Sequence, residues 1–187
     1  MTLCERKIGG RILCIRLSGL GDVVHALNAL SVLRSHRPEA HIAWVIEDRF
    51  RHLLTGHPCI DELFVVPRGD WGEDATNPLR WGGILHEAGD LATRLRRRNF
   101  DVSIDFQSSL KSSWLVAAAG AETRIGFGWN VGRELSTLFQ NTPVSVPDAG
   151  CHRIERDLAL LAPLGIPTTY EKAVLVCSEQ DTAAVQD

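Results

Sequence analysis

Residues 11–22 read Arg-Ile-Leu-Cys-Ile-Arg-Leu-Ser-Gly-Leu-Gly-Asp, an apolar run followed by a glycine-rich turn. Directly after it, residues 23–36 carry apolar side chains at three- and four-residue spacing, which predicts a helix with one face against a sheet. The helix should end before Pro38, because the residue that precedes a proline is pushed out of the α region. A strand, a turn and a helix in this order begin a βαβ unit, so the stretch predicts a parallel sheet.

The same alternation continues along the chain. Gly165 and Pro167 then mark the end of the last helix. The expected strands are 11–17, 41–47, 63–66, 101–106, 124–127 and 143–146, and the expected helices are 23–36, 87–98, 110–120 and 152–164. We therefore predict an α/β fold, a Rossmann-like parallel sheet with helices on both faces.

The predicted domain covers residues 1–167, and residues 168–187 are expected to be a linker and the start of a further domain that is missing. A long segment, 68–84, is rich in glycine and proline and carries Trp71 and Trp81. Such a segment is either a functional loop or a plain surface insertion, and the residues do not decide between them.

Composition limits the possible functions. With 187 residues, 44% of them hydrophobic and 23% charged, the chain is typical of a globular protein. A net charge of −3 argues against nucleic acid as a partner, so any anion site must be local. The five cysteines are scattered without a C-x-x-C pair, and no apolar run could span a bilayer. These features favour a soluble cytoplasmic protein that at most touches a membrane.

The glycine-rich turn lies where ligands of open α/β sheets bind, at the carboxyl end of a strand. Free N–H groups at the following helix start attract anions, and Gly19 and Gly21 beside Ser18 let a ligand approach the main chain. The turn does not match the dinucleotide fingerprint, because Val24 stands where that motif has its third glycine.

Asp22 is the first candidate for chemistry in this turn. A carboxylate at the mouth of such a crevice can accept a proton as general base, although an aspartate here can also simply cap the helix. His25 lies one turn further on and could orient that carboxylate, or it could be an ordinary packed histidine.

A second polar group follows a later strand, in Asp105-Phe-Gln-Ser-Ser-Leu-Lys-Ser112. This segment lies at the same edge of the predicted sheet. Lys111 falls in the first turn of a helix, where the positive end of the dipole opposes a cation, so an anionic partner would explain it. The alternative is a solvated lysine beside Ser108 or Ser109 as a helix cap.

Other catalytic patterns are missing from the sequence. The seven histidines show no metal-ligand spacing such as H-E-x-x-H, and no Cys/His cluster accompanies them. No G-x-S-x-G motif occurs, so a Ser-His-Asp hydrolase is not indicated.

Taken in order, several segments resemble the N-terminal half of glycosyltransferase family 9, the ADP-heptose:lipopolysaccharide heptosyltransferases. The segments are 11–27, 100–112, Arg124-Ile-Gly-Phe127, Arg133-Glu134, His152-Arg-Ile-Glu-Arg156 and Leu164-Gly165. The resemblance is distributed over the chain from Arg11 to about Gly165, which makes it stronger than any one motif.

The resemblance implies a GT-B enzyme, in which two Rossmann-like domains face each other and the N-terminal one handles the acceptor. Asp22 then matches the catalytic base, which deprotonates the acceptor hydroxyl as it attacks the anomeric carbon, inverts the configuration and expels ADP. Gln107 and Lys111 match positions lining the same cleft, with Ser108 beside them. The donor would be ADP-heptose, and the resemblance implies neither a metal nor another cofactor.

The implied acceptor is the inner core attached to lipid A, reached at the inner face of the cytoplasmic membrane. Its negative charge suits arginine-bearing loops such as the one with Arg68 and Arg80. Asn28 stands where many members have proline, and Ser108-Ser109 replace a usual Gly-Leu, so the subgroup and acceptor sugar stay open.

Length sets this chain apart from a complete enzyme of that family. A second domain would need roughly 150 further residues, so the chain alone is expected to be inactive. One alternative is a non-catalytic α/β module that binds a sugar or a nucleotide. Another is a nicotinamide-dependent oxidoreductase, in which Glu47 or Asp48 would hold the ribose, although the broken glycine fingerprint counts against it.

Overall fold

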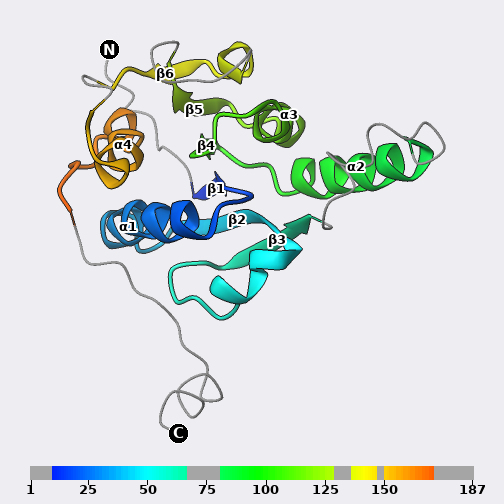
Figure 1. Cartoon of the computed structure of the whole chain (residues 1–187), viewed down its shortest axis with the longest axis horizontal. Coiled ribbons are helices and arrows are strands. Elements are labelled where there is room, and N and C mark those ends of the chain that lie inside the picture. Colours follow the sequence, from blue (N-terminus) through cyan, green and yellow to red (C-terminus); the bar gives the residue numbers. More distant parts are fainter. Residues whose placement is uncertain (1–9, 67–80, 129–135, 147–149, 171–187) are drawn as a thin grey trace, which may run out of the picture.

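The computed structural model describes residues 10–66, 81–128, 136–146 and 150–170. Its centre is a parallel sheet of six strands in the order β3-β2-β1-β4-β5-β6 (Figure 1). The strands are β1 (Arg11–Ile15), β2 (His41–Glu47), β3 (Glu62–Val66), β4 (Val102–Asp105), β5 (Thr123–Phe127) and β6 (Thr142–Val144). The predicted Rossmann-like parallel sheet is confirmed, and each predicted strand is present within a few residues.

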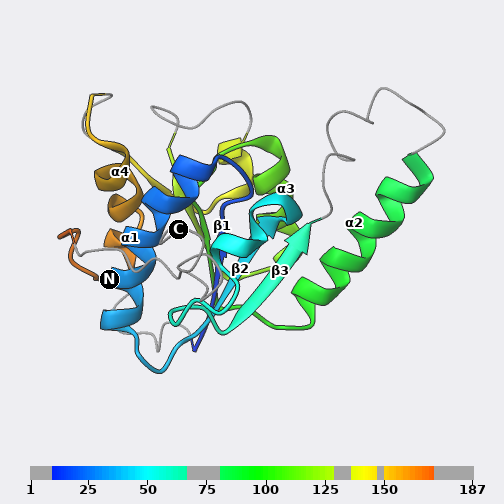
Figure 2. The same ribbon diagram turned by 60° about the horizontal axis from the view of Figure 1, so that its bottom comes forward.

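Helices cover both faces of the sheet. On one face lie α1 (Leu20–His36) and α4 (Arg153–Ala159), and on the other lie α2 (Trp81–Arg96) and α3 (Leu110–Ala119) (Figures 1 and 2). Three short 3-10 helices, η2 (Asp48–Leu53), η5 (Ser136–Phe139) and η6 (Ala162–Leu164), complete the connections.

The position of β1 in the centre of the sheet explains why its sequence is apolar throughout and does not alternate with polar residues. Ile12 and Cys14 pack in the core beneath α1 and α4, whereas Leu13 and Ile15 pack in the core beneath α2 and α3. Successive side chains of a strand point to opposite faces, and both faces are covered here. Burial on both sides therefore demands a continuous apolar run.

The start of α1 differs from the prediction. The helix begins at Leu20, three residues earlier than the apolar spacing indicated, and Gly19 is its N-cap with φ +86°. No side chain caps this end, so Asp22 lies inside the first turn. The alternative in which Asp22 caps the helix is therefore wrong.

The last predicted helix is divided in two. α4 ends at Ala159, and the remaining residues form a turn and η6, which has Pro163 in its first turn. Proline has no N–H for a helical hydrogen bond, so a continuous helix through this position is unfavourable. The predicted stop at Gly165 is confirmed, because this residue adopts the left-handed conformation with φ +69°.

Several predictions fall on residues outside the described ranges. These are residues 67–80 of the long segment, with Arg68 and Trp71 among them, and the apolar run after Tyr170. The division into a domain at 1–167 and a linker at 168–187 stays a prediction. Within the described ranges, no helix combines the length and the apolar character needed to cross a bilayer.

One carboxyl group is buried in α4, which packs against α1. Asp157 is 2% exposed, and its Oδ2 has no hydrogen-bond partner among the described residues. Burial raises the pKa of Asp157 from 3.8 to about 7, while the charges of Arg16 and Arg153 oppose the rise. The folded protein therefore holds a proton here at pH values where the unfolded chain has lost it.

Replacing Asp157 by asparagine should change how stability depends on pH. From about pH 4 to about pH 7 the folded state binds more protons than the unfolded state, so wild-type stability falls as pH rises across this window. Asp157→Asn removes this contribution. Its free energy of unfolding relative to wild type should rise by up to about 4 kcal/mol across the window, since one pKa unit corresponds to about 1.4 kcal/mol.

Urea unfolding of both proteins at a series of pH values measures this difference. Glu39→Gln is the control, because Glu39 is an exposed carboxylate and its removal should leave the difference from wild type nearly flat. A parallel dependence of wild type and Asp157→Asn on pH would contradict the assignment.

Candidate functional site

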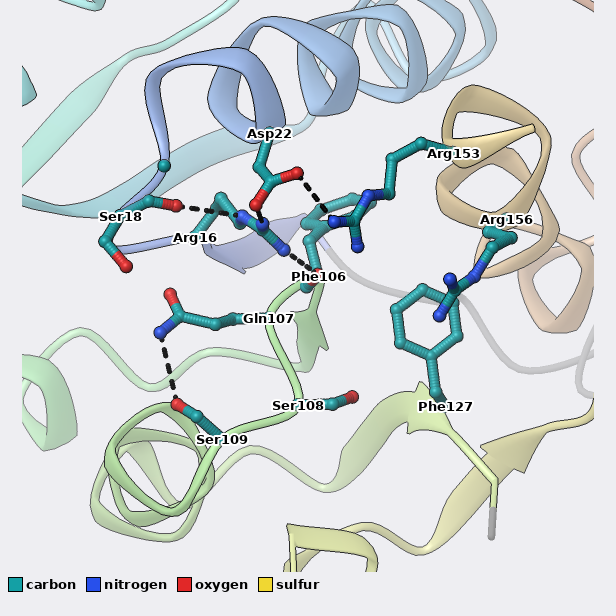
Figure 3. Close-up of a pocket in the computed structure, with 11 residues that line it drawn as sticks. Arg16, Ser18, Asp22, Phe106, Gln107, Ser108, Ser109, Phe127, Arg153 and Arg156 are labelled. Atoms are coloured by element: carbon teal, nitrogen blue, oxygen red, sulfur yellow. Dashed lines mark hydrogen bonds and ion pairs between the residues drawn. The ribbon is translucent and has the colours of Figure 1, made fainter. Parts of the chain in front are cut away.

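A cleft of about 310 Å³ opens where the strand order reverses. β1 leads to α1 on one face and its neighbour β4 leads to α3 on the other, and Ile15 pairs with Asp105 where both strands end. Such a switch point leaves a crevice at the carboxyl edge of a sheet. The lining residues are Arg16, Ser18, Gly19, Asp22, Phe106, Gln107, Ser108, Ser109, Phe127, Arg153 and Arg156 (Figure 3).

Asp22 points from the first turn of α1 into this cleft, between two arginines (Figure 3). Its side chain is 28% exposed. Oδ2 forms an ion pair with Arg16 Nη2, and Oδ1 lies 3.0 Å from Arg153 Nη2. The carboxylate is thus held at the sheet edge and remains open to solvent on one side.

Gly19 makes room for this carboxylate. A Cβ atom at Gly19 would lie 2.7 Å from Asp22 Oδ2, and the φ of +86° is one that other residues rarely adopt. The glycine therefore serves the placement of Asp22. Gly21, in contrast, lies in the helix with open space where a Cβ would stand, and it does not line the cleft.

Arg16 forms the floor of the cleft. Its guanidinium donates from Nη1 to the Phe106 carbonyl at 2.6 Å and from Nε to the Ser18 carbonyl at 3.3 Å. Burial lowers the pKa of Arg16, and the nearby Asp22 carboxylate opposes this shift. A buried cation left without its partner is costly, so Arg16 and Asp22 depend on each other.

The turn between β4 and α3 is organised by a buried carboxylate. Asp105 Oδ1 accepts hydrogen bonds from the N–H groups of Gln107 at 2.9 Å and Ser108 at 3.0 Å, and Oδ2 accepts one from Ser112 Oγ at 3.0 Å. Burial raises the pKa of Asp105, and these hydrogen bonds oppose the rise. Ser109 caps α3 in a reciprocal box with Ser112, as one alternative predicted.

Two polar side chains of this turn reach the cleft in different ways. Gln107 Oε1 accepts from Leu17 N–H at 2.8 Å and its Nε2 donates to Ser109 Oγ at 3.2 Å, so the amide links the two loops. Ser108 is held at φ +55° and is 3% exposed. Its hydroxyl has no hydrogen-bond partner among the described residues, and it lies in the cleft wall.

The predicted site residues are thus only partly brought together. Ser18, Gly19, Asp22, Gln107 and Ser108 all line the cleft. The other three predicted residues, Gly21, His25 and Lys111, do not line it. The ring of His25 packs edge-on against that of His152, with 5.7 Å between the ring centres.

Lys111 points elsewhere because a carboxylate holds it. Its Nζ lies 3.1 Å from Glu47 Oε1, and Glu47 Oε2 also accepts from Arg49 Nε at 2.9 Å. Lys111 is not among the residues that line the cleft of Asp22, and its part in substrate binding stays a prediction. Glu47, which together with Asp48 was a candidate ribose ligand in the oxidoreductase alternative, is buried between these two cations.

Five lining residues received no role from the sequence, although all of them lie within the segments that resemble family 9: Arg16, Phe106, Phe127, Arg153 and Arg156. Arg153 and Arg156 lie three residues apart on α4, after its N-cap His152, and so share a helix face. The guanidinium of Arg156 lies 5.4 Å from the centre of the Phe127 ring. The three-residue spacing of Arg153 and Arg156 was visible in the sequence. No feature of the sequence, however, indicated that α4 packs beside α1.

The chemistry of the lining favours an anionic ligand. Three guanidinium groups and one carboxylate line the cleft, and arginine binds carboxylates and phosphates through a planar pair of donors. Among the described residues, no three His, Cys, Asp or Glu side chains gather in a set that could hold a metal ion.

Known proteins resemble this chain along most of its length. Lipopolysaccharide heptosyltransferase 1 of Pseudomonas aeruginosa is 31% identical over 153 residues, which are 81% of this chain and 42% of the relative. The enzyme of the same name from Escherichia coli K12 is 29% identical over 155 residues, 81% of this chain and 46% of the relative. The chain therefore spans less than half the length of these curated relatives.

A solved structure described as E. coli heptosyltransferase WaaC with ADP-2-deoxy-2-fluoro heptose superposes with a TM-score of 0.75 at 26% identity. The superposition covers 87% of this chain and 51% of that one. The family model for glycosyltransferase family 9 (heptosyltransferase) matches residues 88–187, just over half of the chain. Together with the parallel sheet and its cleft, this match shows that the chain belongs to glycosyltransferase family 9.

Proposed function

We propose that this chain is the acceptor-binding part of a transferase that moves heptose from ADP-heptose to the inner core of lipopolysaccharide. Asp22 is the general base of the reaction. The observation that carries this proposal is the position of Asp22, partly exposed in the cleft at the switch point of a family 9 fold. The relatives and the WaaC complex with an ADP-heptose analogue support the choice of donor and reaction.

In the proposed reaction a carboxylate oxygen of Asp22 takes the proton of an acceptor hydroxyl. The hydroxyl oxygen forms a bond to the anomeric carbon of the heptose from the face opposite ADP. The bond from that carbon to the phosphate oxygen of ADP breaks, and its electron pair leaves with the diphosphate, so the configuration inverts. The second domain of the family's two-domain arrangement would supply most donor contacts.

Guanidinium groups supply positive charge for both substrates. Arg16, Arg153 and Arg156 face a space that an acidic acceptor sugar or a phosphate could enter. Fixed cations stabilise a leaving diphosphate as its charge develops. We therefore propose a reaction without a metal ion or another cofactor. We place the protein in the cytoplasm, at the inner face of the membrane that carries the lipid A-linked acceptor.

Replacing Asp22 by asparagine should abolish the proton transfer while keeping the size of the side chain. We expect kcat for heptose transfer to fall by about 10²–10⁴-fold, the usual contribution of a general base. Steady-state assays of the full-length enzyme with ADP-heptose and a Kdo-lipid A acceptor measure this effect. Asp90→Asn is the matched control, because Asp90 is an exposed aspartate of α2 whose Oδ2 lies 3.5 Å from His86 Nε2, outside the cleft.

Circular dichroism and thermal unfolding of Asp22→Asn check that the loss does not come from misfolding around Arg16. A folded Asp22→Asn protein that transfers heptose at the wild-type rate would refute the role of Asp22 as base.

Ser108 offers a test that separates substrate binding from stability. Its left-handed φ of +55° suits glycine, so Ser108→Gly should fold at least as stably as wild type. If the unpartnered hydroxyl binds the acceptor, its loss should raise the KM for the acceptor about fivefold, the effect of one hydrogen bond worth ~1 kcal/mol.

Measuring kcat, KM and the unfolding midpoint of Ser108→Gly together checks this prediction. The results are compared with those for wild type and for Ser108→Ala, which also lacks the hydroxyl group. An unchanged KM in a stable Ser108→Gly protein would remove Ser108 from the acceptor site.

A further inference from the structure

Both oxygens of Asp22 are occupied in this structure. Oδ2 is paired with Arg16 Nη2 and Oδ1 lies 3.0 Å from Arg153 Nη2 (Figure 3). Each oxygen of a carboxylate has two lone-pair sites, and a guanidinium group holds one of the two on each oxygen here. An acceptor hydroxyl that approaches Oδ1 from the side of α4 can bond to this oxygen only after Arg153 has withdrawn.

The two arginines are held very differently. Arg16 is 6% exposed and is fixed by the carbonyls of Phe106 and Ser18 as well as by Asp22. Arg153 is 41% exposed, and among the described residues Asp22 is the one carboxylate within ion-pair distance of its guanidinium. Exposed ion pairs contribute little net stability, so Arg153 can change partners at small cost.

Donor groups for a second anion lie next to Arg153. Arg156 stands three residues further along α4 and lines the cleft, and its Nε is buried without a partner among the described residues. The Ser108 hydroxyl is likewise buried, unpartnered and part of the cleft wall. An acidic group that enters here would meet Arg153, Arg156 and Ser108 together.

We propose that Arg153 is a positioning residue that leaves Asp22 for an acidic group of the acceptor and thereby frees Asp22 Oδ1 to receive the acceptor proton. This inference rests on the proposed function and specifies how the same site selects its acceptor. An acceptor without an acidic group at this position would bind beside a base that Arg153 still covers. Specificity would then appear in the rate of transfer and not only in binding.

A cycle of binding measurements tests the exchange without any catalysis. Inorganic phosphate and the sugar acid 3-deoxy-octulosonate are titrated separately by calorimetry into four proteins: wild type, Asp22→Asn, Arg153→Ala and the double variant. If Asp22 competes with the ligand for Arg153, Asp22→Asn should tighten binding about fivefold in the wild-type background. The same change should alter binding less than twofold when Arg153 is absent.

The two probes separate the possible sources of the acidic group. Tightening with the sugar acid assigns the site to a sugar carboxylate, and tightening with phosphate assigns it to a phosphate group. Equal tightening in both backgrounds would mean that Asp22 repels anions without exchanging Arg153, which overturns the proposal. Failure of both probes to bind any of the four proteins also overturns it.

Kinetics provide a second readout that does not depend on Asp22→Asn folding. The acceptor is compared with a form from which the acidic group has been removed, by esterification of the carboxylate or by dephosphorylation. Wild type should lose at least tenfold in kcat on the neutral form. Arg153→Ala should have similar kcat values on both forms, and Arg153→Lys should restore part of the difference.

Arg51→Ala is the control, since Arg51 makes a comparable exposed ion pair with Asp48 outside the cleft and should behave as wild type. A loss confined to KM, or an equal loss in wild type and Arg153→Ala, would overturn the role of Arg153. Absence of heptose transfer by the wild-type full-length enzyme would refute the proposed function. The binding measurements would still decide whether Arg153 leaves Asp22 for an anionic ligand.

Discussion

Arg16 lies just beyond the end of β1, and its buried guanidinium reaches three parts of the chain at once. It binds the Phe106 carbonyl after β4, the Ser18 carbonyl before α1 and the Asp22 carboxylate in the first turn of α1. A cation removed from water must be fully paired, so these loops are fixed relative to one another. The position of the candidate base thus follows from the need to pair one arginine.

The two connections at the switch point, β1 to α1 and β4 to α3, are stabilised in different ways at the same edge of the sheet. After β1 the chain relies on Gly19, whose missing side chain leaves room for a carboxylate over the turn. After β4 it relies on Asp105, a buried carboxylate that collects N–H and hydroxyl donors and holds Ser108 in a left-handed conformation. α4 then closes the third side with two arginines.

The fold was predictable because parallel strands covered on both faces leave a plain signal, as the unbroken apolar run of β1 shows. Asp22 and Ser108 could be placed in the cleft for a similar reason, since each follows a strand at a sheet edge. The role of Arg16 and the ion pair of Lys111 could not be predicted from the sequence. Both depend on partners distant in sequence, Phe106 and Glu47, which no local pattern identifies.

The buried acid of α4 gives the cleft a charge that varies near neutrality. Three arginines line the cleft together with Asp22, and the charges of Arg16 and Arg153 also act on Asp157, whose pKa burial raises to about 7. When Asp157 is protonated, the arginines are offset by one negative charge, and when it is ionised they are offset by two. A fall in pH through this range would therefore strengthen the attraction of the cleft for anionic molecules, and a rise in pH would weaken it.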